Sequence, residues 1–373
     1  CNPEPDPNTP RGVIAGTITT PVLLEKEGVE INIAAQLMGD FTTFTSNDGT
    51  YIVEHLMEGD DFTIQPQFNP AIDLAEVSTG DLILISRHIL GLDLFGTPFQ
   101  YVAADVNNDQ RINVVDMIAI RRVILGLTQD FGQSNSWRFV SADHNFNSLP
   151  ENWLESNLME VYNVNDLDGR MLSADFTAIE LGNVSAATEA GNLIGPAGGR
   201  SDFALSVPLL SLEENRFYEV PFYQPAELLG FQTTIQLQPG LELEEIIYGT
   251  AGEGDFNLNY VANGLIGIAH VSAQQGNAPV FTLKLRATAA GQLNDLLLLN
   301  DRIVTTESYA QEANYPVTAQ LGLDFIEASP VELSNVVQSL ELEQNYPNPF
   351  QHETRIDYTL PTATEVILTV RDL

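Results

Sequence analysis

One twelve-residue stretch, residues 105–116 (DVNNDQRINVVD), constrains the chain more than any other. Oxygen-bearing side chains stand at its first, third, fifth, ninth and twelfth positions: Asp105, Asn107, Asp109, Asn113 and Asp116. A calcium ion takes about six to eight hard oxygen ligands, and a loop that supplies them at these positions adds a main-chain carbonyl at the seventh. That residue is Arg111. The spacing therefore predicts a calcium site made of these six residues.

The alternative for such a stretch is a solvated surface turn rich in Asp and Asn. Residues 117–126 (MIAIRRVILG) favour the ion, because they have helical periodicity and stop at a glycine. The loop resembles that of EF-hand proteins, with two departures: Gln110 replaces the sixth-position glycine, and Asp116 replaces the bidentate glutamate. A left-handed Gln110 costs about 1 kcal/mol, so we expect binding without exceptional affinity.

The helix after this loop has a twin earlier in the chain. Residues 81–92 (DLILISRHILGL) match residues 116–127 (DMIAIRRVILGL), an internal repeat with an offset of 116 − 81 = 35 residues. Two loop-helix units with Ile-Leu-Gly-Leu endings resemble a type I dockerin, the calcium-binding half of the cohesin and dockerin pair. The resemblance covers residues 68–130 and implies a small helical calcium-binding unit there.

The first loop of the repeat lacks most of the ligand types. Apolar residues replace those of the first three ligand positions: Pro70, Ile72 and Leu74. Only Ser78 and Asp81 keep oxygen-bearing side chains, so we do not expect a normal calcium site in this loop. An irregular second metal site would take Asn69, Asp73, Ser78 and Asp81.

Length and charge limit the classes of function. The 373 residues suffice for two to four domains with their own cores. An apolar fraction of 44% argues against general disorder, and no apolar run is long enough for a transmembrane segment. With 15 basic and 51 acidic residues the net charge is −36. Nucleic acid and anionic membranes require positive patches, so we predict neither as a partner and favour cations.

Residues 1–10 read as a proline-rich linker. Cys1 is the only cysteine, so no disulfide can form within the chain. It marks either a processing boundary or the lipidated N-terminus of a lipoprotein, and the sequence leaves both open.

Residues 11–67 have the pattern of β-strands. Apolar or β-branched residues recur with period two: Val13, Ala15, Thr17, Val29, Ile31, Ile33, Phe62 and Ile64. Residues 47–49 (NDG) predict a hairpin before Tyr51 and Val53. Residues 16–20 (GTITT) and 47–51 (NDGTY) resemble the carboxypeptidase-regulatory-like domain, which implies a prealbumin-like β-sandwich of the kind used as a spacer in surface proteins.

Residues 131–190 contain both tryptophans and few clear periods, and we expect an irregular segment packed on the helical unit. Residues 165–169 (NDLDG) are incomplete as a cation loop and predict a turn. Residues 175–182 predict a short element that packs back on the helices. The glycine-rich residues 191–200 predict a linker.

Residues 201–328 return to period two. The alternating apolar positions include Phe203, Leu205, Val207, Phe231, Ile235, Phe281, Leu283 and Leu285. Glycine-containing turns between these runs predict an antiparallel sandwich. Residues 230–237, 241–247 and 280–287 resemble a cohesin-like jelly roll. We therefore predict a mainly β, multidomain protein with a prealbumin-like sandwich, a small α-helical dockerin-like calcium unit and a cohesin-like jelly-roll β-sandwich.

Residues 329–373 predict a proline-rich linker that enters a hairpin. Within them, residues 342–350 (LEQNYPNPF), 354–361 (TRIDYTLP) and 366–373 (VILTVRDL) resemble the start of a type A C-terminal sorting domain. The resemblance implies export by the type IX secretion system to the cell surface. Such a domain is an address and says nothing of activity.

Catalytic motifs are absent from the sequence: H-E-x-x-H, G-x-S-x-G, G-x-x-x-x-G-K and C-x-x-C. The five histidines are scattered, and the abundant carboxylates are better explained by an acidic surface than by a glycosidase-like pair. We predict that the protein is not an enzyme.

Three functional readings follow. The first is a secreted, calcium-stabilised structural or adhesive surface protein, whose modules pair between neighbouring chains into a filament or surface layer. The second is a docking or polysaccharide-binding module of an extracellular complex. An aromatic-lined groove on a sandwich would favour polysaccharide, whereas exposed apolar residues on helices 82–91 and 117–126 would favour a protein partner. The alternative to both is that the two modules pack on each other within one chain as a rigid rod. The third, a hydrolase, would need a pocket with a carboxylate pair of perturbed pKa, and the sequence offers no such pair.

Overall fold

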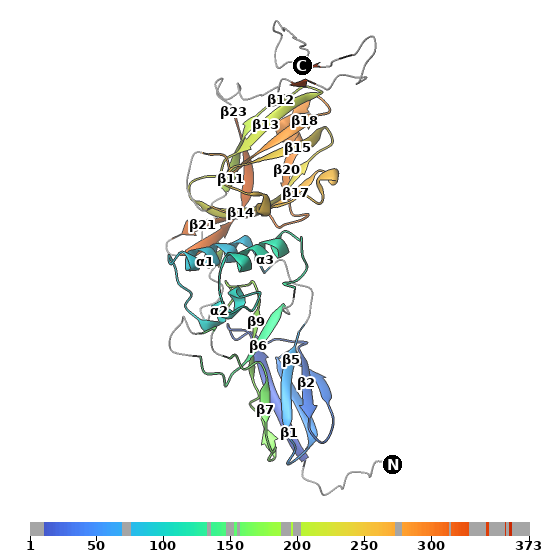
Figure 1. Ribbon diagram of the computed structural model, residues 1–373, viewed down its shortest axis with the longest axis vertical. Helices are drawn as coiled ribbons and strands as arrows, with labels where there is room; N and C mark the ends of the chain where they lie inside the picture. The colour runs from blue at the N-terminus through green and yellow to red at the C-terminus, as the bar shows by residue number, and fades with distance from the viewer. Residues whose placement is uncertain are drawn as a thin grey trace, which may run out of the picture.

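Three parts follow one another along an elongated molecule: a β-sandwich, a layer of helices and a second β-sandwich (Figure 1). The predicted fold class, mainly β and multidomain, is confirmed. The computed structural model describes residues 11–68, 76–132, 136–146, 153–154, 157–187, 195–196, 203–272, 278–312, 315–327, 341–342, 355 and 358–359.

The N-terminal sandwich consists of two sheets. Its strands are β1 (Arg11–Thr19), β2 (Glu30–Ala35), β3 (Phe41–Phe44), β4 (Thr50–Met57), β5 (Phe62–Gln67), β6 (Trp137–Ser141), β7 (Tyr162–Val164), β8 (Arg170–Met171) and β9 (Phe176–Glu180). One sheet has the order β4-β1-β9-β6, with β8 beside β1, and the other has the order β3-β2-β5-β7. The interior between them is apolar, with Ile31, Ile33 and Ile64 fully buried as their alternation predicts.

In strand β1 the even-numbered residues face the core, whereas the alternation noted in the sequence was that of Val13, Ala15 and Thr17. Ile14 and Ile18 are fully buried, whereas Val13, Ala15 and Thr17 are half-buried. Gly16 belongs to the buried face because the carbonyl of Ala174 lies against it and leaves no room for a Cβ atom.

The expected hairpin at residues 47–49 is wrong. Strands β3 and β4 on either side of this turn belong to different sheets, so the turn carries the chain across the sandwich. The Asp48 carboxylate holds the turn, because its Oδ1 accepts hydrogen bonds from Ser46 Oγ (2.6 Å) and Thr50 Oγ1 (2.6 Å). An Asn-Asp-Gly turn can form in a hairpin or in a connection between two sheets. Only the strand pairing shows which of the two is present.

Residues 131–190 are less irregular than expected, because they return to the N-terminal sandwich. Strand β9 lies parallel to β1, β6 pairs with β9, and β7 pairs with β5. These strands have at most five residues each, too few to show a period, and the pairings with β1 and β5 join residues more than 90 positions apart in the chain. The helical unit is therefore an insertion in the sandwich, joined to it by both of its ends.

The inserted unit contains helices α1 (Thr79–Ile89), α2 (Pro98–Ala104) and α3 (Val114–Ile124). Helices α1 and α3 start 35 residues apart, as the repeat predicts, but each starts three residues and ends two residues before the predicted helices 82–91 and 117–126. Gly91 and Gly126 follow their ends in the left-handed region (φ 68° and 65°). Helix α2 was not predicted. Its signal is the sequence Thr97-Pro98-Phe99-Gln100, in which the threonine caps the helix and the glutamine completes a capping box.

The C-terminal sandwich follows. Its strands are β10 (Gly195–Pro196), β11 (Phe203–Leu209), β12 (Ser211–Leu212), β13 (Arg216–Phe222), β14 (Leu228–Leu237), β15 (Leu241–Tyr248), β16 (Phe256–Asn257), β17 (Leu265–Val271), β18 (Phe281–Ala287), β19 (Gly291–Gln292), β20 (Leu297–Asn300), β21 (Glu307–Glu312), β22 (Tyr315–Ala319) and β23 (Leu321–Glu327), with the short helix α4 (Leu293–Leu296). One sheet has the order β10-β22-β21-β14-β17-β16, with β20 beside β14. Opposite it lie β13-β18-β15, and β11 runs parallel to β23.

Of the predicted sorting segment, the structure describes a pairing of β24 (Glu341–Leu342) with β25 (Tyr358–Thr359) and residue 355. The rest of the predicted hairpin, the N-terminal linker and most of the linker at 191–200 lie outside the described residues.

One hydrophobic cluster joins the helices to the C-terminal sandwich. It contains Ile83 of α1 and Ile120 of α3 together with Ala269 of β17 and Tyr309 of β21. Two buried hydrogen bonds cross the same boundary. Asn257 Nδ2 donates to the carbonyl of Leu125 (2.7 Å), and Gln232 Oε1 accepts from the backbone N–H of Thr79 (2.7 Å). The helical unit is thus docked on the sandwich of its own chain.

Asn257→Ala tests this boundary, because it leaves the carbonyl of Leu125 buried without its donor. We expect the free energy of unfolding in a urea titration to fall by about 1–3 kcal/mol. Asn263→Ala, at an exposed position of the same sandwich, is the control. Equal losses for the two variants would contradict the importance of the Asn257 bond.

Candidate functional site

The predicted calcium loop connects helix α2 to helix α3. Asp105 forms the C-cap of α2, and Asn113 forms the N-cap of α3 by accepting a hydrogen bond from the backbone N–H of Val115 (2.8 Å). The first and ninth positions of the loop are therefore fixed by the two helix ends. Of the predicted ligands, Asp105 and Asp116 are buried and Asp109 is exposed at the rim.

The backbone of the loop folds around the carboxylate of Asp105. Its two oxygens accept hydrogen bonds from the backbone N–H groups of Asp109 (3.0 Å) and Gln110 (2.9 Å). Gln110 has φ 66°, the left-handed conformation expected for the sixth position, and Asn108 has φ 54°. At the rim, Asn107 Nδ2 donates to Asp109 Oδ2 (3.2 Å). The turn is thus formed in the way that the spacing of the loop requires.

Asp116 is the residue of this loop whose hydrogen bonding is incomplete. Its Oδ2 accepts from the backbone N–H of Asn113 (3.0 Å), whereas its Oδ1 is buried and has no hydrogen-bond partner among the described residues. Burial, and to a smaller extent the negative charges of Asp105 and Asp109, raise the pKa of Asp116 to about 6. A buried, unpaired carboxylate oxygen is costly unless a cation or a donor meets it.

The twin residue Asp81 differs in this respect. Its Oδ2 accepts from the backbone N–H of Ser78 (2.9 Å), and its Oδ1 accepts from the backbone N–H of Ser185 (2.8 Å). Protein donors therefore satisfy both oxygens in the first unit of the repeat. Ser78 and Asp81, two residues of the candidate second metal site, lie together in a capping box. The other two, Asn69 and Asp73, lie outside the described residues, so that site stays a prediction.

The donor chemistry of the second loop fits calcium better than a softer metal. In the described part of the chain, no group of three or more His, Cys, Asp or Glu side chains is gathered as a metal site, and Asp105, Asp109 and Asp116 are therefore not gathered into one in this structure. By residue type, the loop offers their carboxylates together with amide oxygens and a main-chain carbonyl. Such mixed, all-oxygen sets are those that calcium takes. The unpaired Oδ1 of Asp116 is the observation that points to a cation.

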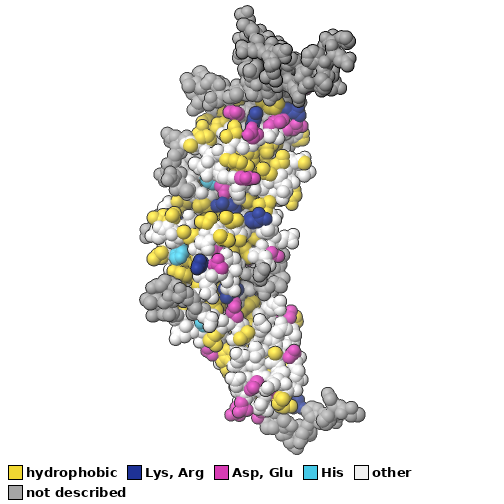
Figure 2. All heavy atoms as spheres, in the orientation of Figure 1, with side chains coloured by type: hydrophobic (Ala, Val, Ile, Leu, Met, Phe, Trp, Pro, Cys, Tyr) yellow, Lys and Arg dark blue, Asp and Glu magenta, His cyan; other side chains and the backbone are white. Residues whose placement is uncertain are grey.

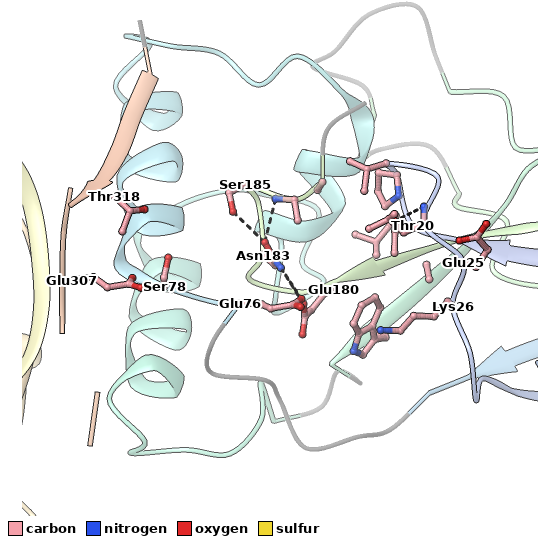
Figure 3. Close-up of a pocket in the computed structure, with 18 of the residues that line it drawn as sticks. Thr20, Glu25, Lys26, Glu76, Ser78, Glu180, Asn183, Ser185, Glu307 and Thr318 are labelled. Carbon is pink, nitrogen blue, oxygen red and sulfur yellow. Dashed lines mark hydrogen bonds between the residues drawn. The ribbon is translucent and has the colours of Figure 1, made fainter. Parts of the chain in front are cut away.

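A cavity of about 440 Å³ lies where the three parts of the molecule meet. The β1–β2 connection, strands β6 and β9, and strands β21 and β22 all contribute to its walls (Figure 3). Figure 3 shows Glu76, Glu180 and Asn183 close together on one side of it. Asn183 Nδ2 donates to Glu180 Oε2 (3.0 Å) and lies 3.4 Å from Glu76 Oε2. Sequence reasoning missed this pocket, because nothing in the chain links residue 76 to residue 180.

Glu180 keeps its proton more strongly than an ordinary carboxyl group. Burial is the main reason that its pKa is raised, and the hydrogen bond and negative charge of Glu76 raise it further. Asn183 lies between the two carboxyl groups and within hydrogen-bond distance of both, so the two groups share one amide donor.

Lys26 also lines the pocket. Lys26 Nζ lies over the ring of Trp137, 3.8 Å from its centroid, and 4.8 Å from that of Phe68. Trp137 is buried in the N-terminal core, as a tryptophan in such a segment usually is. The ammonium group on its face contributes a favourable cation–π contact at this joint.

His270 is part of the boundary between α3 and the C-terminal sandwich. Its Nδ1 lies 3.0 Å from Asp255 Oδ2, and Arg121 of α3 meets Asp255 Oδ1 at 2.7 Å. All three side chains are largely buried. Arg121 therefore places a charge-assisted contact between the helical unit and the sandwich. The remaining described histidines lie elsewhere in the fold, in agreement with their scatter in the sequence.

The comparisons with known proteins give only distant likenesses. No family model matches the chain, and no curated protein matches it in sequence. In structure it is similar to the seventh ScaB type I cohesin from Pseudobacteroides cellulosolvens, with 16% identity and a TM-score of 0.23 over 35% of this chain and 96% of that one. A non-cellulosomal cohesin from the archaeon Archaeoglobus fulgidus has 15% identity and a TM-score of 0.20, over 37% and 100% of the two chains.

The full-length major pilin SpaD from Corynebacterium diphtheriae has 8% identity and a TM-score of 0.26, over 84% of this chain and 64% of that one. At these TM-scores none of the likenesses indicates a shared function. The resemblances of residues 68–130 to a dockerin and of residues 329–373 to a sorting domain stay predictions. Among the described residues, no helix is both long and apolar enough to cross a membrane.

Glu180→Gln tests the protonated carboxyl group. The pKa of Glu180 in the folded state lies above the ordinary value of 4.5, so the proton stabilises the fold below that value and the benefit is lost as the pH rises. A glutamine stays neutral at every pH. We therefore expect similar melting temperatures at about pH 5 and a variant that melts several degrees higher at about pH 9.

Glu25→Gln is the matched control, because it removes a carboxyl group from the exposed side of the same pocket. We expect its melting temperature to follow that of the unmodified protein at both pH values. A Glu180→Gln variant whose difference from the unmodified protein does not change with pH would show that this carboxyl group titrates normally.

Proposed function

We propose that this protein is a non-catalytic structural or adhesive rod of an extracellular surface, in which one calcium ion braces the helical unit between two β-sandwiches. The observation that carries the proposal is the double attachment of that unit. It is inserted in the N-terminal sandwich and shares a buried hydrophobic cluster with the C-terminal sheet. Parts that share a packed core move as one body more readily than parts joined by a linker.

The contacts at both boundaries support rigidity. Towards the C-terminal sandwich, Arg121 with Asp255 and Asn257 with Leu125 add buried polar contacts to the apolar cluster. Towards the N-terminal sandwich, β9 contributes Ala178 to the core of the sandwich and Ile179 to the cluster of the helices. Buried, directional contacts of this kind fix one arrangement of the parts. A spacer that holds another group at a fixed distance from a surface needs this rigidity.

Calcium would be held by the side chains of Asp105, Asn107, Asp109, Asn113 and Asp116 and by the main-chain carbonyl of Arg111. When bound, the ion would neutralise the carboxylates that now raise one another's pKa. The comparison of the twin residues supports this assignment. Asp81 has donors for both oxygens, whereas Asp116 has a buried oxygen without one. The ion would thereby tie the end of α2 to the start of α3.

The proposed location is outside the cell. A net charge of −36 with two lysines suits a protein that works in salt and divalent cations, and the resemblance of residues 329–373 to a type IX address agrees with it. The pairing of the helical unit with the second sandwich occurs within one chain here. A filament formed by the same pairing between neighbouring chains would have to open this contact first, so we favour the rod.

Asp109→Ala tests the calcium ion. A ligand that binds only the folded chain increases the free energy of unfolding by RT ln(1 + [L]/Kd), which is about 2.7 kcal/mol at a hundredfold excess over Kd. We expect the variant to melt several degrees lower than the unmodified protein in millimolar calcium and within about a degree of it in excess chelator. Differential scanning calorimetry under both conditions measures the two differences.

Asp130→Ala is the matched control. Asp130 is an exposed aspartate whose Oδ1 accepts a hydrogen bond from the backbone N–H two residues later, as Asp109 Oδ1 does. Its loss should have the same small effect with and without calcium. If Asp109→Ala behaved like this control, Asp109 would not be a ligand.

A further inference from the structure

Strand β6 lies where the N-terminal sandwich meets the helices (Figure 1), and its two faces serve different parts of the molecule. Figure 2 shows basic side chains at several places along the rod. Trp137 and Phe139 belong to the core of the sandwich, whereas Val140 belongs to the cluster of the helices. Successive side chains of a strand point to opposite faces, so Arg138 lies on the same face as Val140. That face is the one turned towards the helical unit.

Two acceptors hold the guanidinium group of Arg138. Its Nε donates to Glu160 Oε1 (2.8 Å), and its Nη1 donates to Asn108 Oδ1 (2.9 Å). Only 11% of the Arg138 side chain is exposed. A guanidinium group is planar and its donors have a fixed geometry, so two partners on two of its nitrogens define one orientation. Arg138 is therefore a directional link between strand β6 and Asn108.

Asn108 belongs to the calcium loop without being one of its predicted ligands. It stands between Asn107 and Asp109, and its backbone N–H donates to the carbonyl of Asp105 (3.4 Å). Its φ is 54°, in the left-handed region, where a residue other than glycine is held by its surroundings. The hydrogen bond from Arg138 supplies such a hold. The link thus runs from the N-terminal sandwich to the turn that carries the predicted ligands.

We propose that Arg138 is a positioning residue for the calcium loop and couples calcium binding to the docking of the N-terminal sandwich, an inference that rests on the calcium site proposed above. Ligation would fix the turn through its ligand residues, whereas Arg138 fixes the same turn through Asn108. Two contacts that favour one conformation of a loop strengthen each other, because each lowers the cost of ordering that the other pays. Linkage makes this effect reciprocal.

The charge of Arg138 acts on the ion in the opposite direction. Burial raises the pKa of Asp105, and the nearby positive charge of Arg138 opposes that rise. A positive charge close to a calcium site also repels the ion, so its removal alone would strengthen binding. Loss of the hydrogen bond to Asn108 would weaken binding. We expect the hydrogen bond to dominate, because the carboxylate of Glu160 already balances the charge of Arg138.

Calcium titration of the full chain by isothermal calorimetry tests this role. Arg138→Lys keeps the charge, but one ammonium group lacks the fork that serves Glu160 and Asn108 together. We expect its dissociation constant for calcium to rise about fivefold, the equivalent of one hydrogen bond. Arg138→Gln should show a smaller rise, because it also removes the repulsion.

Arg170→Gln is the matched control. It removes the same charge from an exposed position of β8, in the same sheet as β6. Its dissociation constant for calcium should stay within about twofold of that of the unmodified protein. The melting temperature of each variant in excess chelator shows separately whether the variant is folded.

A double variant shows whether Arg138 acts through Asn108. Asn108→Gly removes the acceptor without straining the turn, because glycine adopts a positive φ readily. In this background, Arg138→Lys should change the dissociation constant by less than about twofold, against about fivefold in the unmodified chain. The extra freedom of the glycine is present in both members of the comparison and cancels.

The outcomes separate this role from the proposed function. No calcium binding by the unmodified protein would overturn both. Calcium binding with the same dissociation constant in Arg138→Lys would overturn the role of Arg138 alone. Tighter binding in Arg138→Gln would show that Arg138 acts only as a repelling charge, and an undiminished effect of Arg138→Lys in the Asn108→Gly background would show that Asn108 is not its route. Either result would contradict the proposal.

Discussion

The rest of the structure depends on the burial of one side of a helix pair against the C-terminal sheet. Helices of eleven residues are marginal alone in water. Here Ile83, Ile120 and Ile124 gain cover from a cluster that includes Ala269 and Tyr309 of the sandwich. The same unit is inserted between strands β5 and β6 of the N-terminal sandwich. Its packing therefore fixes the position of one sandwich relative to the other. The elongated form in Figure 1 follows from that position.

The internal repeat gives the unit two loops, and the chain uses them differently. In the first loop the backbone of Ser185 completes the bonding of Asp81, whereas in the second loop an oxygen of Asp116 has no protein donor. Duplicated sequence therefore does not imply duplicated function. What surrounds each copy decides whether its aspartate is satisfied by the protein or left for an ion.

Local patterns in the sequence predicted the elements that depend on local interactions. The presence of α1 and α3 with their 35-residue offset, the left-handed Gln110 and the buried residues of β2 follow from the repeat, loop spacing and alternation, although both helices start three residues before the predicted positions. Pairings between distant segments could not be predicted in this way. The return of β9 to the N-terminal sandwich, the sheet change at Asp48 and the proximity of Glu76 to Glu180 depend on contacts across the fold. Helix α2 had a recognisable capping box, which a closer reading of Thr97 and Gln100 would find.

The most direct test of the rod is the distribution of distances across the helical unit. Spin labels on cysteines introduced at the exposed Gln67 and Asn259, in a Cys1→Ser background, would lie in the two sandwiches on either side of it. Pulsed electron–electron double resonance on a dilute sample in saturating calcium measures the distribution of distances between the two labels. A single narrow distance is the predicted result, because the parts share packed cores. A broad or multiple distribution in saturating calcium would show that the sandwiches move independently and would contradict the account.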